Sequence, residues 1–192
     1  MSDDLLKINN KPKLLFHICC APCSGWISQQ LRERFDLTVY FDNSNIWPEE
    51  EFQKRAQEAS NYFSQLGVDF VLVEPDHDAW KKSVEIWSQE PERGKRCKLC
   101  YYQRLKQSAQ YAKDKGFDYL ATSLTISPHK DARCLNALGV ALAKKYDLNF
   151  LTDNFRLNDG YKKSQELAKA LDFYRQNYCG CEFGLKNGKI IV

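Results

Sequence analysis

The sequence predicts an α/β protein built on a doubly wound, mainly parallel sheet of about five strands. Short apolar runs alternate with longer segments of helical spacing along the 192 residues, which is the pattern of consecutive βαβ units. Several runs are apolar throughout, as in parallel strands that helices cover on both faces. The hydrophobic content of 43% is enough for a real core, and residues 1–192 are predicted to form a single domain.

Each predicted element follows from a local pattern. The predicted strands are the apolar runs at residues 14–18, 37–41, 68–73, 117–122 and 148–151. The predicted helices have apolar residues three and four positions apart, and they cover residues 25–35, 49–66, 97–115, 131–146 and 160–171. Ser24 precedes the first helix and is predicted to be its N-cap. A segment rich in tryptophan and charge, about residues 76–100, is predicted to be a helical insertion.

Seven of the eight cysteines fall into three tight clusters, about eighty residues apart in the sequence. They are Cys19, Cys20 and Cys23 in CCAPC, Cys97 and Cys100 in CKLC, and Cys179 and Cys181 in CGC. The first cluster directly follows the first predicted strand, so it should lie on a strand-to-helix turn, where open α/β sheets bind ligands. Chance would not group cysteines in this way. The clusters are therefore predicted to meet as a cysteine-rich metal site at the carboxyl ends of the strands, whereas the lone Cys134 is predicted to be a packed core thiol.

Three kinds of site use such a gathering of thiols. A four-thiolate zinc site would take two Cys-x-x-Cys pairs, such as Cys20/Cys23 and Cys97/Cys100, but it would leave three thiols over. A thioredoxin-like oxidoreductase needs only one such pair, in a smaller fold. An iron–sulfur centre fits best, because cubane clusters take up to four cysteines from separate segments. The CGC pair is then either a strained, easily reduced disulfide or a pair of ligands to a second metal.

Composition and charge narrow the class of protein further. No stretch approaches the roughly 20 apolar residues of a membrane span, and the polar N-terminus is unlike a secretory signal. We therefore expect a cytoplasmic protein with no membrane contact, a setting in which clustered thiols usually bind metal or do redox work. Residues 1–96 carry a net charge of −4 and residues 97–192 a net charge of +7. The basic half is compatible with a polyanionic partner such as RNA or with an ordinary solvated surface.

Six sequence motifs follow one another along nearly the whole chain. They are CCAPCS at 19–24, NSNIWP at 43–48, RCKLC at 96–100, GFDYLATSLTISPHK at 116–130, GYKKS at 160–164 and YRQNYCGCEF at 174–183, accompanied by Glu51, Arg55 and Arg104. As an ordered set they are specific, and the chain resembles the QueH-type epoxyqueuosine reductases. The resemblance implies a Rossmann-like fold, akin to the adenine-nucleotide hydrolase-like domains of tRNA thiolation enzymes, which agrees with the predicted sheet.

The resemblance also implies a function. The family reduces epoxyqueuosine in tRNA to queuosine, the last step in making this wobble-position modification, and its members look like iron–sulfur enzymes that need no cobalamin. The implied cofactor here is a [4Fe–4S] cluster, with the ligands Cys19, Cys20, Cys97 and Cys100. Cys179 and Cys181 are implied to be a redox-active pair or ligands to a second, mononuclear iron. The implied partners are tRNA and an electron donor that the sequence does not identify.

Removing an epoxide oxygen as water consumes two electrons and two protons, so an acid is expected near the site. The candidates are His17, Asp42, His129 and Asp131. For His17, a buried structural histidine is the favoured interpretation. Asp42 and Asn43 end the second predicted strand and are candidate substrate contacts, and Arg104 is a further candidate on the helix that carries CKLC. Cys23 lies near the metal but is surplus to a four-thiolate cluster.

Two other functions account for part of the pattern. A zinc-stabilised RNA-binding module accounts for the basic half but leaves the extra thiols without a role. A tRNA-thiolation-type enzyme accounts for the fold and the clustered thiols. It would need ATP, however, and the sequence has no Ser-Gly-Gly-x-Asp-Ser phosphate loop after the first predicted strand and neither of the common glycine-rich nucleotide motifs. The reductase is the favoured function.

Overall fold

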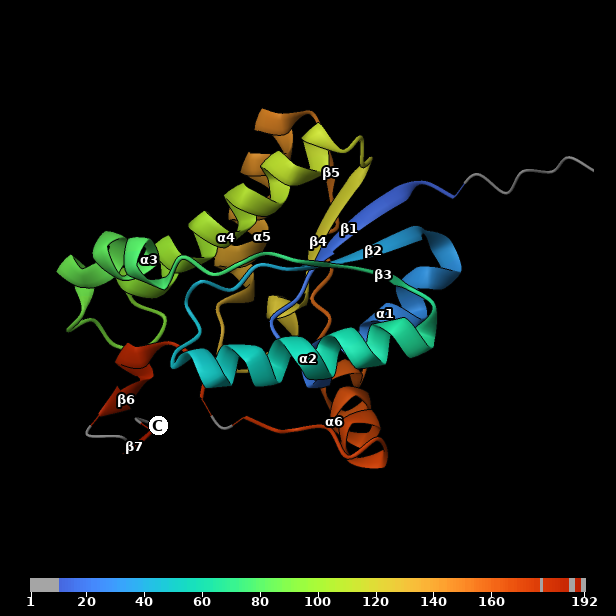
Figure 1. Ribbon diagram of the computed structural model, residues 1–192. Coiled ribbons are helices and arrows are strands. Elements are labelled where there is room, and N and C mark those ends of the chain that lie inside the picture. The colour runs from blue at the N-terminus through green and yellow to red at the C-terminus, as the bar shows by residue number, and fades with distance from the viewer. Residues whose placement is uncertain (1–10, 177, 187–188, 191–192) are drawn as a thin grey trace, which may run out of the picture.

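The centre of the molecule is a parallel sheet of five strands in the order β3-β2-β1-β4-β5 (Figure 1). The computed structural model describes residues 11–176, 178–186 and 189–190. The strands are β1 (Lys13–His17), β2 (Asp36–Phe41), β3 (Asp69–Leu72), β4 (Tyr119–Thr122) and β5 (Asn149–Phe150). The predicted α/β class with a five-stranded parallel sheet is confirmed. The direction of strand order reverses between β1 and β4, and ligands bind at such switch points in open sheets.

Helices cover both faces of this sheet. The α-helices are α1 (Ala21–Arg34), α2 (Glu49–Leu66), α3 (His77–Val84), α4 (Lys95–Asp114), α5 (Ala132–Tyr146) and α6 (Gly160–Ala170). The short elements are the 3-10 helices η1 (Glu85–Trp87), η2 (Ser123–Ile126) and η3 (Glu182–Gly184), and an antiparallel pair, β6 (Leu185–Lys186) and β7 (Lys189–Ile190). Figure 1 shows α1, α2 and α6 on one side of the sheet and α4 and α5 on the other. The five predicted helices are all present, and the predicted insertion contains α3 and η1.

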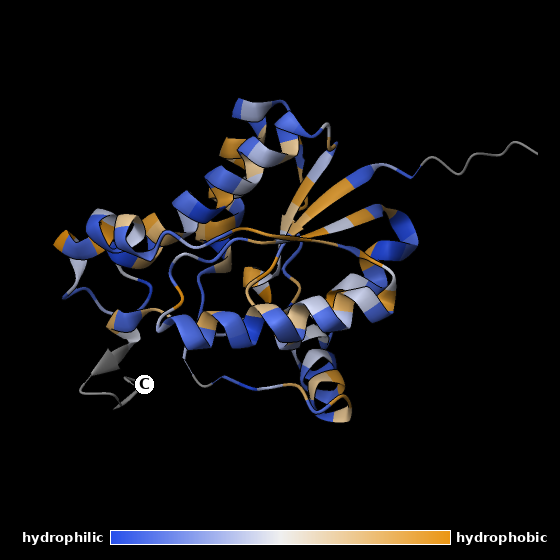
Figure 2. Ribbon diagram, in the orientation of Figure 1, coloured by the Kyte–Doolittle hydropathy of each residue, from blue (hydrophilic) through white to orange (hydrophobic). Residues whose placement is uncertain are grey.

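Alternating side chains of β1 supply two separate cores. Leu14 and Phe16 pack against α1 and α2, whereas Leu15 points to the opposite face and packs against α4 and α5. Successive side chains of a strand point to opposite faces, so a strand between two helical layers must be apolar throughout. Figure 2 accordingly shows the central strands as largely hydrophobic, while hydrophilic and hydrophobic residues alternate along the helices.

The start of α1 differs from the prediction and brings the helix up to the cysteines. Ser24 is not the N-cap; the helix begins at Ala21, its N-cap is Cys20, and Pro22 lies in its first turn. Proline suits this position because its fixed φ is helical and its missing N–H would be unpaired there anyway. The Ser24 hydroxyl instead donates to the carbonyl oxygen of Cys20 at 2.7 Å. The free N–H groups of the first turn therefore lie beside the Cys19–Cys20 pair, where they favour anionic groups.

The carboxyl ends of β1, β2 and β4 meet at one edge of the sheet, because the three strands pair in parallel and in register. His17 at the end of β1 is level with Tyr40 of β2 and with Thr122 of β4. The segments that follow these strands, including CCAPC, therefore share that edge. Among the described residues, no helix is both long enough and apolar enough to cross a membrane.

Candidate metal and redox centre

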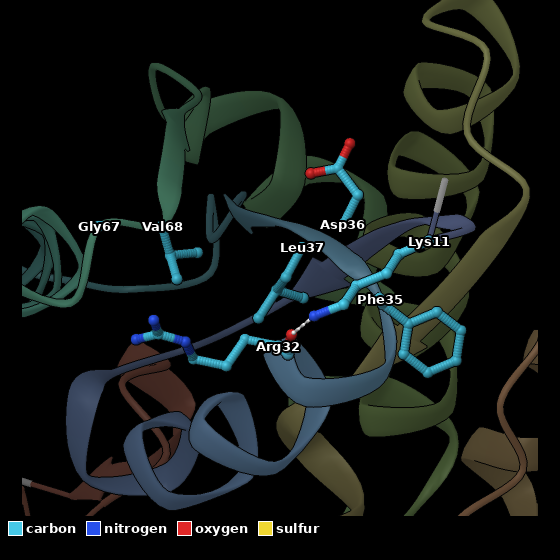
Figure 3. A pocket seen from close by; sticks show the side chains of 7 residues that line it. All are labelled: Lys11, Arg32, Phe35, Asp36, Leu37, Gly67 and Val68. Atoms are coloured by element: carbon cyan, nitrogen blue, oxygen red, sulfur yellow. Dashed lines mark hydrogen bonds between the residues drawn. The ribbon is translucent and has the colours of Figure 1, made fainter. Parts of the chain in front are cut away.

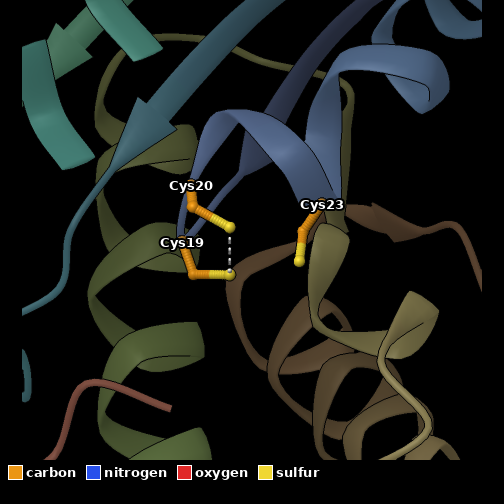
Figure 4. A group of neighbouring side chains, drawn as sticks. All are labelled: Cys19, Cys20 and Cys23. Atoms are coloured by element: carbon orange, nitrogen blue, oxygen red, sulfur yellow. Dashed lines mark hydrogen bonds between the residues drawn. The ribbon is translucent and has the colours of Figure 1, made fainter. Parts of the chain in front are cut away.

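The first cysteine cluster forms a compact group of sulfur atoms at the end of β1. The Sγ atoms of Cys19, Cys20 and Cys23 all lie within 4.8 Å of one another, and the Cys19 and Cys20 sulfurs are 3.7 Å apart. Figure 4 shows the three side chains pointing into the same space, two from the strand-to-helix turn and one from the first turn of α1. Cys23 is thus close enough to the other two thiols to share a metal with them, although the sequence analysis counted it as surplus to a four-thiolate cluster.

The other two cysteine pairs line a small cavity of about 30 Å³ at the same edge. Cys97 and Cys100 come from the first two turns of α4, and Cys179 and Cys181 come from the segment after α6. The remaining lining residues are Asn45, Trp80, Glu92, Arg96, Tyr101, Arg104 and Lys130. Cys97 also packs against the core that contains Cys19 and Cys20. Hence the three clusters gather at the carboxyl edge, as predicted, and each of the eight cysteines is a free thiol.

Lys130 is close to the thiols of two of the clusters, CCAPC and CGC. Burial lowers the pKa of its ammonium group, but the thiols of Cys19, Cys179 and Cys23 raise it by more, so that the net change is upward. A cation close to both groups favours the thiolate form in each. Lys130 ends the motif at residues 116–130, which includes β4 and the loop after it, but no local pattern distinguishes it from the other basic residues.

In each of these two cysteine clusters, the contacts favour the thiolate form of one cysteine. Hydrogen bonds from Cys20 and Cys23 lower the pKa of the Cys19 thiol well below its usual range, and the same contact with Cys19 raises the pKa of Cys20 to about 12. In the CGC turn, the hydrogen bond from Cys181 lowers the pKa of Cys179 to about 6, whereas Cys179 raises the pKa of Cys181. The thiolate is the form that binds metals and takes part in disulfide exchange.

Asp42 is a buried carboxyl at the end of β2. Its side chain is 1% exposed, and its Oδ2 atom has no hydrogen-bond partner in the described part of the chain. Burial raises its pKa to about 6, although the positive charge of Arg104 acts in the opposite direction. A carboxyl group with this pKa exchanges a proton close to neutral pH, which is the property of a general acid.

Asn43 and Arg104 connect the strands to α4. The Asn43 amide donates to the carbonyl oxygen of Ile18 at 2.9 Å, and its oxygen accepts a hydrogen bond from the Arg104 guanidinium. Both residues are buried. Arg104 reaches the cavity wall, whereas Asn43 serves to fix the arginine there.

His17 is a buried, neutral histidine. Its Nε2 donates to the carbonyl oxygen of Asp42 at 3.2 Å, and its Nδ1 accepts from the Thr122 hydroxyl at 2.9 Å. Burial, followed by the charge of Arg104, lowers the pKa of His17 to about 3. Both ring nitrogens are occupied by the framework, which is the arrangement of a structural histidine.

The two remaining acid candidates lie in the loop between η2 and α5. Asp131 is the N-cap of α5, and its carboxylate accepts from the backbone N–H of Cys134 at 3.0 Å. His129 is exposed, and its carbonyl oxygen accepts from Arg93 at 3.1 Å. Neither side chain is among the described residues that line the thiol cavity. Cys134 is only partly buried and packs at the margin of the core between the sheet and α5.

The cavity wall contains buried polar atoms without a hydrogen-bond partner in the described residues. They are Asn45 Oδ1, Trp80 Nε1, Arg96 Nε and Arg104 Nε. Buried polar groups are rarely left unpaired unless a ligand, ion or water meets them, and three of these four are donors that suit an anionic or sulfur-rich group. Sequence reasoning missed Asn45, Trp80 and Arg96, because only their neighbours across the cavity give them a role.

A second, larger cavity lies at the opposite edge of the sheet and lacks these features. It measures about 330 Å³ and is lined by residues such as Lys11, Arg32 and Asp36. Figure 3 shows the Lys11 ammonium turned toward the Arg32 carbonyl oxygen, to which it donates at 2.9 Å, and the Arg32 guanidinium donates to Leu66 O at 2.8 Å. Lys11 and Arg32 are thus both hydrogen-bonded to backbone carbonyl oxygens, and no cysteine is among the described residues that line this second cavity.

Comparison with known proteins assigns the chain to a family. The family described as "Epoxyqueuosine reductase QueH" matches residues 14–187. The chain belongs to the QueH family. It is 40% identical to the epoxyqueuosine reductase QueH of Streptococcus pyogenes over 182 residues, which cover 92% of this chain and 71% of the relative. It is 34% identical to the QueH protein of Thermotoga maritima over 176 residues, with 90% of both chains covered. The predicted resemblance is confirmed.

Solved structures with the same fold come from proteins of low sequence identity. The U34-tRNA thiolase NcsA from Methanococcus maripaludis, solved with its [4Fe-4S] cluster, matches with a TM-score of 0.58 at 16% identity, over 97% of this chain and 65% of that one. A predicted subunit of tRNA methyltransferase from Methanocaldococcus jannaschii matches with a TM-score of 0.55 at 14% identity, over 81% and 74%. At these identities the likeness establishes the QueH chain's fold alone, and that fold is the Rossmann-like one expected.

Proposed function

We propose that this chain reduces epoxyqueuosine in tRNA to queuosine at the cysteine-lined edge of the sheet. Its membership of the epoxyqueuosine reductase QueH family supports this activity. The single structural observation that carries the proposal is the gathering of seven thiols at one edge of the sheet: three in a compact group at the end of β1, and four, from two other segments, around the neighbouring cavity. A purely structural metal site has no need of so many thiols.

An iron–sulfur cluster is the cofactor that this donor set fits best. Cys19, Cys20, Cys97 and Cys100 would hold a [4Fe–4S] cluster, and the close approach of Cys23 to the first pair makes it the alternative ligand. A cluster bound there would supply electrons one at a time. An iron with an open position, such as a second, mononuclear iron beside the cluster, would polarise the epoxide oxygen. The buried N–H donors of Trp80, Arg96 and Arg104 face that space and would stabilise its negative charge.

The CGC turn would act as the second electron reservoir. Oxidation of the two thiols to a disulfide releases two electrons and two protons, which balances the conversion of an epoxide into an alkene and water. Cys179 and Cys181 line the cavity together, so this exchange would take place beside the cluster. An external donor would then restore the dithiol. The alternative role for the same pair is to hold a mononuclear iron next to the cluster.

Asp42 is the acid that the geometry supports best among the four candidates. It is buried at the carboxyl edge behind the cavity lining, and the positive charge of Arg104, a residue of the cavity wall, acts on its carboxyl group. His17 is engaged on both nitrogens, and Asp131 caps a helix. We therefore propose that Asp42 delivers a proton toward the departing oxygen.

The tRNA partner explains the excess of positive charge in residues 97–192, because phosphate contacts dominate the affinity of proteins for nucleic acids. A wobble-position base lies in a single-stranded loop and can enter a protein pocket at little energetic cost. Exposed aromatic side chains suited to stacking are available at Trp47 and Tyr102. A tRNA substrate also fits the expectation of a cytoplasmic enzyme.

The decisive test is mass spectrometry of nucleosides from epoxyqueuosine-containing tRNA, before and after incubation with anaerobically purified, reduced protein. We expect epoxyqueuosine to be replaced by queuosine in stoichiometric amount, and we expect the protein to be brown, with about four or more irons per chain. Unchanged tRNA would overturn the function. Full activity in a colourless, zinc-loaded preparation would overturn the cluster but leave the function intact.

A further inference from the structure

Arg55 is a cation buried where its helix would ordinarily bury an apolar residue. It is 1% exposed, and it lies on the inward face of α2 beside Phe52, Ala56 and Ala59. Taking a guanidinium group out of water is costly unless other groups replace the lost water contacts. The Glu51 and Arg55 side chains belong to the motifs that carry the family resemblance, but the proposed chemistry uses neither of them. Their placement therefore calls for another explanation.

The contacts of Arg55 lead from α2 to the CGC turn. Its Nε donates to Glu51 Oε1 at 2.6 Å. Its two terminal nitrogens donate to the carbonyl oxygens of Cys179 at 3.3 Å and Tyr178 at 3.4 Å. The guanidinium carbon also lies 5.3 Å from the centre of the Tyr178 ring. The other oxygen of Glu51 accepts from the Tyr174 hydroxyl at 2.9 Å, so the ion pair binds the C-terminal segment at three successive points.

The loop before α2 holds the same turn from a second side. The backbone N–H of Trp47 donates to the carbonyl oxygen of Gly180 at 2.8 Å, and the Tyr178 hydroxyl donates to the carbonyl oxygen of Trp47 at 2.8 Å. Gly180 has a φ of 101°, which L side chains rarely adopt. A Cβ atom there would come within 3.0 Å of both Arg55 Nη1 and Ile46 Cγ1. Any side chain at residue 180 would therefore be strained and would crowd the guanidinium group.

The opposite side of the turn faces the thiol cavity. The carbonyl oxygens of residues 178–180 point to Arg55 and Trp47, while the Cys179 and Cys181 side chains line the cavity with Cys97 and Cys100. A neighbouring side chain, Gln176, donates to Cys20 Sγ at 2.8 Å. The framework contacts therefore use the backbone of the turn and leave both thiols turned toward the site.

We propose that Arg55, paired with Glu51, is a positioning residue that holds the Cys179–Gly180–Cys181 turn in place over the cysteine cavity. This inference rests on the proposed function, since the turn matters only if its thiols take part in the reaction. Arg55 itself touches no reacting atom. Without the two hydrogen bonds from Arg55 to the carbonyl oxygens of Cys179 and Tyr178, the turn is no longer held against α2. The positions of the Cys179 and Cys181 thiols over the cavity are then no longer fixed.

The test is the Arg55→Lys variant, which keeps the charge but cannot bridge a carboxylate and two carbonyl oxygens at once. The matched control is Arg32→Lys, because Arg32 also donates to a carbonyl oxygen but lies at the far edge of the sheet. Hydrogen exchange of the Trp47 amide reports docking of the turn directly. We expect it to accelerate at least about tenfold in Arg55→Lys and to be unchanged in Arg32→Lys.

Alkylation and kinetics complete the test. We expect Cys179 and Cys181 to react with iodoacetamide several-fold faster in Arg55→Lys, and kcat to fall about ten- to a hundredfold with KM for tRNA nearly unchanged. Tyr178→Phe removes one contact of the same turn without disturbing the buried charge, and a smaller change in the same direction is expected should Arg55→Lys fail to fold. Unchanged Trp47 exchange and unchanged kcat in the folded variants would overturn the proposal. Exchange and alkylation need no substrate, so an inactive wild type would count against the proposed function and not against the positioning role.

Discussion

The thiols of residues 19–23 and those of residues 179–181 reach the same edge of the sheet, but different kinds of contact hold them there. Cys19 and Cys20 follow the central strand directly, and Cys23 stands in the first turn of the next helix, so backbone geometry alone brings the three sulfurs within 4.8 Å. The CGC turn has no such support from regular structure. Its backbone contacts Arg55 and Trp47, more than 120 residues away in the sequence, and the Glu182 carboxylate just after it pairs with His77 and Lys81.

This difference matches the roles proposed for the two groups. A cluster needs ligands fixed at definite distances, which a strand-to-helix turn provides. A redox pair must form and break a bond, so a segment held by a few replaceable contacts can open more easily. Regular structure therefore fixes the first group, whereas tertiary contacts fix the turn.

The largest expected effect is the loss of turnover on replacing a clustered cysteine, and the iron content of each variant then distinguishes metal ligands from the redox pair. Cys20→Ser and Cys179→Ser should each lower turnover by at least about a thousandfold, as for groups that act as a unit. Only Cys20→Ser should also lower the iron content, measured by metal analysis and by the broad absorbance near 400 nm. Cys134→Ser is the control, because this partly buried thiol lies outside all three clusters. Loss of iron in Cys179→Ser as well would instead assign the turn to a second iron.

The next effect concerns Asp42, whose burial raises its pKa to about 6 from an ordinary value of 3.8. The folded protein binds this proton more tightly than the unfolded chain does, so the contribution to stability is complete below about pH 3.8 and is lost as the pH rises through about 6. Replacing the carboxyl group by an amide removes this loss. Asp42→Asn should therefore gain up to about 3 kcal/mol relative to wild type between pH 4 and pH 7.5.

Urea unfolding at pH 4, 5.5 and 7.5 measures the effect. Asp36→Asn, the same substitution at an exposed site at the other end of β2, is the control for the chemical change itself. A constant difference between Asp42→Asn and wild type at all three pH values would mean that Asp42 is ionised in the folded protein. If Asp42 is the proton donor, the same variant loses activity while it gains stability.

A smaller effect is expected from Gly180→Ala. The added methyl group meets Arg55 and Ile46 at 3.0 Å, and the φ of 101° is strained for alanine, so the turn should shift at a cost of about 1–3 kcal/mol. Gly116→Ala is the matched control, since Gly116 also has a positive φ of 69° but no atom within 4 Å of a Cβ. Both variants should lose some thermal stability, but only Gly180→Ala should speed alkylation of Cys179 and Cys181. Equal alkylation rates would show that the turn is not tightly packed.

The same contrast explains how much the sequence could predict. The strands, the span of α2 and the meeting of the cysteine clusters followed from apolar runs, helical spacing and the position of CCAPC after a strand, which are local signals. The burial of Arg55 and the cavity position of Lys130 depend on contacts between distant segments, and no local pattern marks them. The start of α1 was missed for a different reason, because Ser24 was given the capping role although Pro22 was already suited to the first turn.

The smallest effect tests whether the first group is built by its own local contacts. Ser24→Ala removes the 2.7 Å hydrogen bond to the Cys20 carbonyl oxygen and should cost about 1 kcal/mol of stability. Ser28→Ala is the control, since this buried hydroxyl of the same helix has no hydrogen-bond partner in the described residues, and its removal should be neutral or stabilising. Thermal unfolding compares the two variants. Gln176, just before the CGC turn, donates to Cys20 Sγ at 2.8 Å, and neither variant removes this link. Trp47 amide exchange should therefore not change in either variant; faster exchange in Ser24→Ala would show that residues 19–23 and the CGC turn form one cooperative unit.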